Sequence, residues 1–206
     1  MRRLSGTAIL CAAIAACALT GALAASASAS PAWKFEGLTL LGNETIVGKA
    51  LEDRLTIPGL TTKCELTYKM TISNNAGTGK GEITEMQLKN CTTTSKACAV
   101  ETAFAKETPW PLHLATVGGK NYVILEKVLF EFVYSGEECA LAETLVTVSG
   151  SAGGLFSNTS STITFSSLSF AETGTELTAL GERVEWSCIL TTEATGLHKG
   201  QALQVG

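Results

Sequence analysis

Aspartate and histidine are nearly missing from this sequence of 206 residues, which holds one aspartate, Asp53, and two histidines, His113 and His198. A single aspartate excludes calcium loops of the D-x-D-x-D type and leaves any Ser-His-Asp triad dependent on one residue. His113 lies between two leucines of an expected strand and should face solvent, while His198 lies in a glycine-flanked loop. Neither G-x-S-x-G nor H-E-x-x-H occurs. The sequence therefore predicts no catalytic residue and no cofactor.

Metal and phosphate motifs are absent as well. No two cysteines stand in a C-x2-C arrangement, and both histidines lie far from the cysteines in sequence, so we expect no metal site. Gly77-Thr-Gly-Lys-Gly81 resembles a phosphate loop only superficially. Residue 74 is Asn where such a loop has Gly, and Gly81 stands where it has Ser or Thr. We interpret this stretch as a hairpin turn.

Charge is missing from the beginning of the chain, where no charged residue lies between Arg3 and Lys34. The interval begins with an alanine-rich apolar run and continues with small residues in A-x-A arrangements. A basic start, an apolar middle and such small residues predict a helical secretory signal peptide over residues 1–29. We expect cleavage after Ala29, with Ala27 as the alternative.

Two alternatives to a cleaved signal are open. The apolar run is long enough to stay in the membrane as an anchor, although Ala, Gly and Thr give weak insertion energy. Ile14-Ala-Ala-Cys17 resembles the bacterial lipobox, whose cysteine carries a lipid and becomes the N-terminus of a surface lipoprotein. Against lipidation at Cys17, the residues after it stay apolar, as in the middle of a longer signal. Membrane contact is expected through this segment alone.

Positive charge is scarce in the rest of the chain. The formal net charge is −4, and it becomes −6 once Arg2 and Arg3 leave with the signal. An acidic mature chain argues against nucleic acid or an anionic membrane surface as the main partner. The remaining 177 of the 206 residues are enough for one sizeable core, so we expect a single β-rich secreted domain over residues 30–206.

A strand hairpin is the clearest local pattern. Apolar residues occupy every second position in one stretch: Cys64, Leu66, Tyr68, Met70 and Ile72. This period of two is typical of a half-buried strand, and the polar, glycine-rich residues 73–81 then reverse the chain. If Ile72 lies opposite Ile83, antiparallel counting places Cys64 opposite Cys91. The pattern predicts a disulfide across the hairpin.

Further strands follow, and no helix of three turns is expected. Residues 33–60 read as short entry strands, with a single helical turn at residues 50–54. Residues 122–134 are apolar on both faces, which indicates a central strand. Serines and glycines at residues 149–154 should break the next strand, and a change of phase at residues 166–167 suggests a β-bulge. The fold class is all-β, an antiparallel two-sheet sandwich or flattened barrel with disulfides.

Five cysteines follow the predicted signal, an odd number that cannot all pair within one chain. Export makes disulfides the default. Our preferred set is Cys64–Cys91 with Cys139–Cys188, and Cys91–Cys98 is the main competitor. In the preferred set Cys98 is a free thiol, which is either buried and inert or exposed as a reactive group or dimer bridge.

Trp110 is the one candidate for ligand contact. It lies between Pro109 and Pro111, which cannot donate ladder hydrogen bonds, so the segment is an edge or a loop. An exposed Trp110 would stack on a sugar or anchor a partner. We favour the alternative, in which it fills one end of the sandwich.

Five short motifs follow one another in order along the chain. They are Leu60-Thr-Thr-Lys-Cys64, Met86-x-Leu-x-Asn-Cys91-Thr, Pro109-Trp110-Pro-Leu, Cys139-x9-Ser-Gly, and Cys188 before Gly196-x3-Gly200. This order resembles a group of secreted actinobacterial proteins over roughly residues 60–205. The resemblance implies an exported bacterial β-rich domain with two disulfides, and it implies no activity. Cys98 departs from the four-cysteine pattern of that group.

Two functions from different classes fit these observations. We expect a secreted or cell-envelope-associated structural or binding domain without catalytic activity, whose partner is a cell-wall polysaccharide or an envelope protein. The alternative is an extracellular hydrolase, since eighteen of the 19 acidic residues are glutamates. Such an enzyme needs two glutamate carboxyls facing each other across an open cleft, about 5–10 Å apart.

Overall fold

The computed structural model describes residues 30–206, so the predicted signal peptide and Cys17 lie outside the described residues. The first half of this part contains β1 (Trp33–Phe35), β2 (Leu38–Thr39), β3 (Asn43–Ile57), β4 (Leu60–Asn75), β5 (Thr78–Thr93), β6 (Ala99–Ala105) and β7 (Trp110–Val117). The second half contains β8 (Lys120–Ser135), β9 (Leu145–Ser157), β10 (Thr162–Phe165), α1 (Ser167–Thr173), β11 (Leu177–Ala179), β12 (Glu182–Thr191), β13 (Glu193–Ala194) and β14 (Leu203–Val205). The all-β prediction is confirmed.

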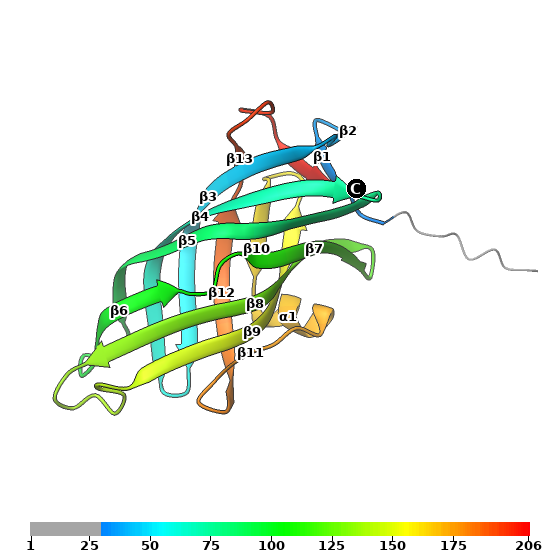
Figure 1. The fold of residues 1–206 in the computed structure, drawn as a ribbon. Coiled ribbons are helices and arrows are strands. Elements are labelled where there is room, and N and C mark those ends of the chain that lie inside the picture. Colours follow the sequence, from blue (N-terminus) through cyan, green and yellow to red (C-terminus); the bar gives the residue numbers. More distant parts are fainter. Residues whose placement is uncertain (1–29) are drawn as a thin grey trace, which may run out of the picture.

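The long strands form a sheet that closes on itself. Antiparallel pairing runs from β3 through β4, β5, β7 and β8 to β9. Strands β10 and β11 each pair with both β9 and β12, and β12 pairs back with β3 (Figure 1). The result is a flattened barrel, within the predicted class. β8 pairs with β6 and β7 on one side and with β9 on the other, which confirms residues 122–134 as a central strand.

A three-stranded sheet of β14, β1 and β2 covers one end of the barrel (Figure 1). Its inward residues, Trp33, Phe35, Leu203 and Val205, are buried in the common core. Asparagine side chains fasten the sheet, because amides can replace the hydrogen bonds of a neighbouring strand. Asn74 accepts from the Trp33 N–H at 2.8 Å and donates to the Trp33 and Leu40 carbonyl oxygens. Asn158 accepts from the Val205 N–H at 2.7 Å and donates to the Val205 oxygen.

The β4–β5 hairpin is longer than expected and contains two bulges. Its turn is only Ala76–Gly77, both with positive φ (52° and 79°), because Asn75 still pairs with Thr78. The register shifts once between Met70 and Lys69 and again between Glu65 and Lys63. Because the turn is so short, Ile72 lies opposite Gly81, and the predicted pairing of Ile72 with Ile83 is wrong.

The two bulges bring the cysteines together nevertheless. Each adds one residue to β5, so the register at the open end of the hairpin reaches Lys63 opposite Thr92. In this register the next residues inward are Cys64 and Cys91, as the predicted disulfide requires. The disulfide Cys64–Cys91 is present, and its prediction is confirmed.

Two expectations about local structure in β3 and β9 are wrong. Residues 50–54 belong to β3 and not to a helical turn, because β12 and β4 pair with this strand on both sides of a register shift. Residues 149–154 do not break the chain but lie inside β9. There, a Cβ on Gly153 would stand 2.1 Å from the Thr173 hydroxyl, and one on Gly154 would stand 2.5 Å from Ile163. These glycines permit close packing of α1 and β10 on β9.

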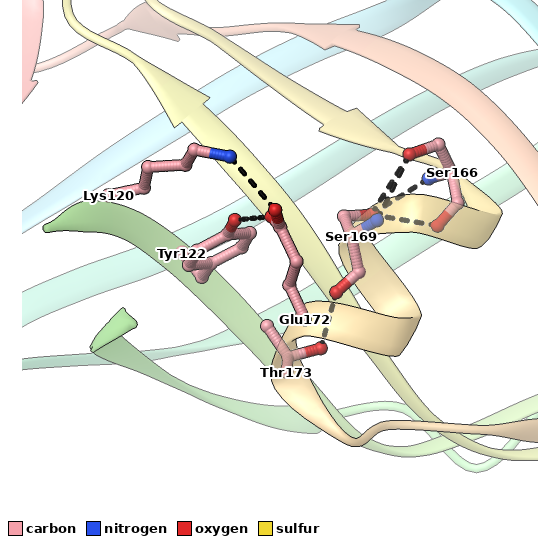
Figure 2. A network of polar contacts seen from close by, with 6 residues as sticks. All are labelled: Lys120, Tyr122, Ser166, Ser169, Glu172 and Thr173. Atoms are coloured by element: carbon pink, nitrogen blue, oxygen red, sulfur yellow. Dashed lines mark hydrogen bonds and ion pairs between the residues drawn. The ribbon is translucent and has the colours of Figure 1, made fainter. Parts of the chain in front are cut away.

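The expected bulge at residues 166–167 is instead the beginning of helix α1. Ser166 is the N-cap, and its hydroxyl accepts from the Ser169 N–H, while the Ser169 hydroxyl accepts from the Ser166 N–H at 2.9 Å. Gly174 ends the helix with a φ of 67°. Figure 2 shows the reciprocal serine contacts at the first turn.

Helix α1 is tied to β8 by a polar network (Figure 2). The Tyr122 hydroxyl donates to one Glu172 carboxylate oxygen, and the Lys120 ammonium lies 2.9 Å from the other. These contacts hold the pKa of Glu172 below its usual value. Burial, together with the neighbouring Glu172 carboxylate, raises the pKa of Tyr122 to about 12. The network fastens α1 to β8.

Candidate functional site

A groove with a volume of about 540 Å³ crosses the outer face of the barrel where β3, β4 and β5 run beside β13 and the end of β12. Its lining residues are Val47, Gly48, Lys49, Thr67, Tyr68, Lys69, Glu85, Gln87, Thr191 and Glu193. We call this feature the outer groove. It gathers charged, amide and hydroxyl groups over a partly apolar floor.

The floor of the outer groove depends on a glycine. Gly48 lies directly opposite Tyr68 in the β3–β4 register. A Cβ at Gly48 would stand 1.9 Å from the Thr191 carbonyl oxygen and 2.6 Å from the Tyr68 ring. The Tyr68 hydroxyl donates to that same oxygen at 2.7 Å. The tyrosine thus crosses under β3 and joins β4 to β12, which makes the floor rigid.

Hydrogen bonds and burial complete this junction. The Thr191 hydroxyl donates to the Lys49 carbonyl oxygen at 3.1 Å and accepts from the Lys49 N–H at 3.3 Å. Burial raises the pKa of Tyr68, and the nearby Cys188 thiol adds to the effect. The neutral Tyr68 hydroxyl acts as a structural crosslink between β4 and β12.

The sides of the outer groove are two rows of side chains that cross three strands. In the first row Val47 pairs with Lys69, and Lys69 pairs with Glu85. In the second row Lys49 pairs with Thr67, and Thr67 pairs with Gln87. Directly opposite residues in antiparallel strands point to the same face, so each row presents its side chains together.

Charge in the outer groove is balanced. The Lys69 ammonium lies 3.2 Å from a Glu85 carboxylate oxygen, and both side chains are partly exposed. Glu193, opposite Val47 on β13, adds a second carboxylate, and Lys49 adds a second cation. Such a surface can donate and accept hydrogen bonds and can pair with an ionic group of either sign.

The disulfides differ from the prediction in their second pair. Cys98 is bonded to Cys139, and Cys188 is a free, buried thiol. The predictions of a Cys139–Cys188 bond and of a free Cys98 are therefore wrong. The reason is the pairing of β6 with β8, which places Ala99 opposite Ser135 and so brings Cys98 beside the turn that holds Cys139.

Cys188 lies in the barrel interior with the only aspartate. Asp53 is its direct partner across β3 and β12, and it accepts a hydrogen bond from the Trp186 indole N–H at 2.7 Å. Burial raises the pKa of Asp53 to about 6, although hydrogen bonds from Trp186 and Cys188 oppose the rise. Burial and the Asp53 carboxylate raise the pKa of the Cys188 thiol well above its usual range. An unionised, enclosed thiol is a core residue, not a nucleophile.

We expect Asp53 to make the protein less stable as the pH rises. A carboxyl with a raised pKa in the folded state favours folding at low pH, and this contribution is lost between about pH 4 and pH 6. The loss amounts to about 3 kcal/mol, on the order of two pKa units. Urea unfolding at pH 4 and pH 7 should show that Asp53→Asn gains stability relative to the wild type at the higher pH. If the free energies of unfolding of the wild type and Asp53→Asn differ by the same amount at both pH values, the raised pKa of Asp53 is contradicted.

Trp110 is fully buried and cannot contact a ligand, which confirms the interior alternative. Its indole N–H donates to the Lys106 carbonyl oxygen at 2.7 Å, and its ring meets Phe130 edge-on at 5.2 Å. His113 lies on the outer face, half-exposed and 3.2 Å from Glu126, as expected from its neighbours.

His198 belongs to a contact that the sequence does not reveal. Its ring stacks on Phe35 at 4.2 Å, and its Nδ1 lies 2.8 Å from the buried Glu44 carboxylate. Glu44 also accepts from the Gly196 N–H at 2.8 Å. Burial acts to raise the pKa of Glu44, but the bonds from His198 and Gly196 outweigh it and hold that pKa below its usual value. The cluster fastens the loop after β13 to the beginning of β3.

Within residues 30–206, no three His, Cys, Asp or Glu side chains gather closely enough to hold a metal ion. In the same part of the chain, no helix has the length and apolar character needed to cross a membrane. No protein-family model, curated protein or solved structure matches this chain. The resemblance to secreted actinobacterial proteins stays a prediction, and a functional assignment rests on the outer groove and its chemistry.

Proposed function

We propose that this chain is a secreted or cell-envelope-associated binding domain without catalytic activity, and that the outer groove is its ligand site. The predicted signal peptide supports export, and disulfides persist in oxidising compartments outside the cytosol. One observation carries the proposal: two rows of hydrogen-bonding and charged side chains stand over a floor that Gly48, Tyr68 and Thr191 make rigid. A rigid site loses little conformational entropy on binding.

The chemistry of the outer groove favours a polar polymer such as a cell-wall polysaccharide. Thr67 and Gln87 supply a hydroxyl and an amide, which can both donate to and accept from sugar hydroxyls. Lys49 and Lys69 are placed to pair with carboxylate or phosphate groups on such a polymer. Recognition would rest on hydrogen bonds and ionic pairs, with Val47 adding an apolar contact beside Lys69.

Retention of the purified protein on isolated cell-wall polysaccharide tests this proposal. The double variant Lys69→Ala/Gln87→Ala should bind at least about tenfold more weakly, since each lost polar contact contributes roughly 1 kcal/mol. Lys63→Ala/Lys89→Ala is the matched control, because these exposed lysines lie on the same two strands outside the outer groove. Lack of retention on every envelope fraction, or an equal loss in the control, would overturn the proposal.

A hydrolase that uses two glutamates is the second candidate, favoured by the presence of Glu85 and Glu193 in the same groove. Glu85 is ion-paired with Lys69, which suits a fixed carboxylate. Release of reducing sugar ends from the same polysaccharide should then occur with the wild type and disappear in both Glu85→Gln and Glu193→Gln. Binding without release would leave the non-enzymatic function.

A further inference from the structure

The barrel wall has an open seam between β5 and β6. Strand β7 pairs with β5 only as far as Ile83, and further along β5 the neighbouring strand is β6, which pairs with β8 but not with β5 (Figure 1). A hollow of about 300 Å³ lies there, lined by residues 88–91 of β5 and 100–103 of β6. We propose that this seam binds an extended peptide segment of a partner protein through main-chain hydrogen bonds.

Two bulges interrupt pairing along the seam. Strand β5 has an extra residue beside Asn90, whose φ is 49°, and β6 has an extra residue at Glu101. Both residues line the hollow. Disulfides hold the two strands at this end of the barrel, because Cys91 of β5 is bonded to β4 and Cys98, just before β6, is bonded to the loop after β8. The seam therefore has a fixed place in the wall.

The alternation of the main chain shows which groups of β6 face the seam. The Lys106 N–H donates to the Leu129 carbonyl oxygen at 2.9 Å and continues the register of β6 with β8. In an antiparallel ladder, pairs that exchange hydrogen bonds alternate with pairs that do not. Lys106 is bonded to β8, so the N–H and C=O groups of Ala105 and Ala103 point away from β8 and toward the seam.

The same reasoning applies to β5. The Thr94 N–H donates to the Thr61 carbonyl oxygen at 2.9 Å, so the odd-numbered residues of β4 face β5 along a strand that has no bulge of its own on this side. Their partners include Gln87 and Lys89. The N–H and C=O groups of Leu88, which lies between these two residues, therefore point away from β4 and toward the seam.

These main-chain groups define what the seam can bind. Within residues 30–206, no strand, loop or side chain hydrogen-bonds to the seam-facing groups of Leu88 or Ala103. The hollow has the volume of about ten water molecules at roughly 30 Å³ each. An extended peptide repeats its N–H and C=O groups about every 7 Å on one side, which matches the unpaired edge of a strand. Extended main chain is thus the expected occupant.

A single peptide segment fits the seam better than a second copy of the barrel does. The edges of β5 and β6 lie on opposite sides of one hollow, so a strand with a sheet behind it cannot enter between them. Exposed Lys89 and Glu101 place one charge of each sign beside the hollow, which favours neither an acidic nor a basic peptide. We therefore expect a segment with little net charge.

Selection of random linear decapeptides, displayed on phage, with the purified protein tests the proposal. Ala103→Pro removes one seam-facing N–H without removing a hydrogen bond to β8, and the extended residue before it is compatible with proline. Selected peptides should bind this variant at least about fivefold more weakly, since a main-chain hydrogen bond contributes roughly 1 kcal/mol. Ala103→Ser keeps the N–H and is the matched control, with the affinity of the wild type.

A second measurement does not depend on how well a variant folds. Methylation of alternate amide nitrogens in a selected peptide removes its donors on one side of the chain. For at least one of the two alternate sets, the affinity for the wild type should fall at least about tenfold. The amide hydrogens of Leu88 and Ala103 should also exchange with solvent more slowly when the unmethylated peptide is bound.

Three results would overturn the proposal. The first is a selection that enriches no peptide. The second is a set of selected peptides that keep their affinity after either methylation, or that bind a folded Ala103→Pro variant as tightly as the wild type. The third is a wild-type dimer that Ala103→Pro does not form, since the seam would then pair with a second copy. The outer groove is tested separately, because retention on polysaccharide should be the same in the wild type and Ala103→Pro.

Discussion

Replacing Cys98 and Cys139 together by serine is expected to lower the free energy of unfolding by about 4 kcal/mol, because the disulfide closes a loop of 41 residues. A loss of this size is a large share of the net stability of an ordinary domain. The bond also holds the start of β6 beside the end of β8, at the edge of the barrel wall. Denaturant unfolding of the double variant measures the effect.

Cys188→Ala serves as the matched control for connectivity. It removes a buried thiol without opening a loop, so the tryptic fragments held together by disulfides should not change. Peptide mapping without reduction should give one crosslinked peptide with Cys98 and Cys139 and another with Cys64 and Cys91. Recovery of a Cys139–Cys188 or Cys91–Cys98 peptide would contradict the pairing of β6 with β8.

Gly48→Ala is expected to destabilise the protein by at least about 3 kcal/mol and to deform the outer groove. The added Cβ would stand 1.9 Å from the Thr191 oxygen, a backbone atom that cannot rotate away as a side chain can. Relief requires β3 to move away from β12, which separates the Tyr68 hydroxyl from its acceptor. Thermal unfolding together with polysaccharide retention measures both consequences.

The neighbouring substitution Lys49→Ala is the control for placing an alanine in β3. It puts alanine at the next position of β3, keeps the backbone bonds to Thr191, and should change stability by less than about 0.5 kcal/mol. If Gly48→Ala and Lys49→Ala have the same melting temperature, β3 and β12 do not approach each other as closely at Gly48 as described.

Local patterns in the sequence predict the strands but not their neighbours. Alternation from Cys64 to Ile72 identifies β4, and two-sided apolarity identifies β8. Both signals are local, and each depends on one strand alone. The Cys98–Cys139 bond depends instead on β6 pairing with β8, in which Ala99 lies opposite Ser135, 36 residues further along the chain, and no local pattern encodes this pairing.

The errors at glycines and serines have a related cause. Gly153 and Gly154 read as a break because glycine is rare inside strands, yet they are required where α1 and β10 approach the backbone of β9. Ser166 reads as a bulge because the phase of the apolar residues changes there, but it begins a two-turn helix through its contact with Ser169. In the first case the structure depends on a tertiary contact, and in the second it depends on a hydrogen bond between two side chains and the backbone. The pattern of apolar residues shows neither.

The outer groove follows from register, and this is why sequence reasoning missed it. Lys49, Lys69 and Gln87 are each ordinary outward residues of alternating strands. Only the pairing of β3 with β4 and of β4 with β5, including the bulge at Thr84, aligns them into rows. Trp110, the single candidate that the sequence offered, is instead part of the core.

Backbone amide chemical shifts, followed while soluble cell-wall polysaccharide fragments are added, test the ligand site most directly. The account predicts saturable shifts confined to residues 47–49 of β3, 67–69 of β4, 85–87 of β5 and 191–193 near β13, which surround the outer groove. The Lys69→Ala/Gln87→Ala variant should show them only at about tenfold higher ligand concentration. Saturable shifts on the opposite side of the barrel, or none at any ligand concentration, would contradict it.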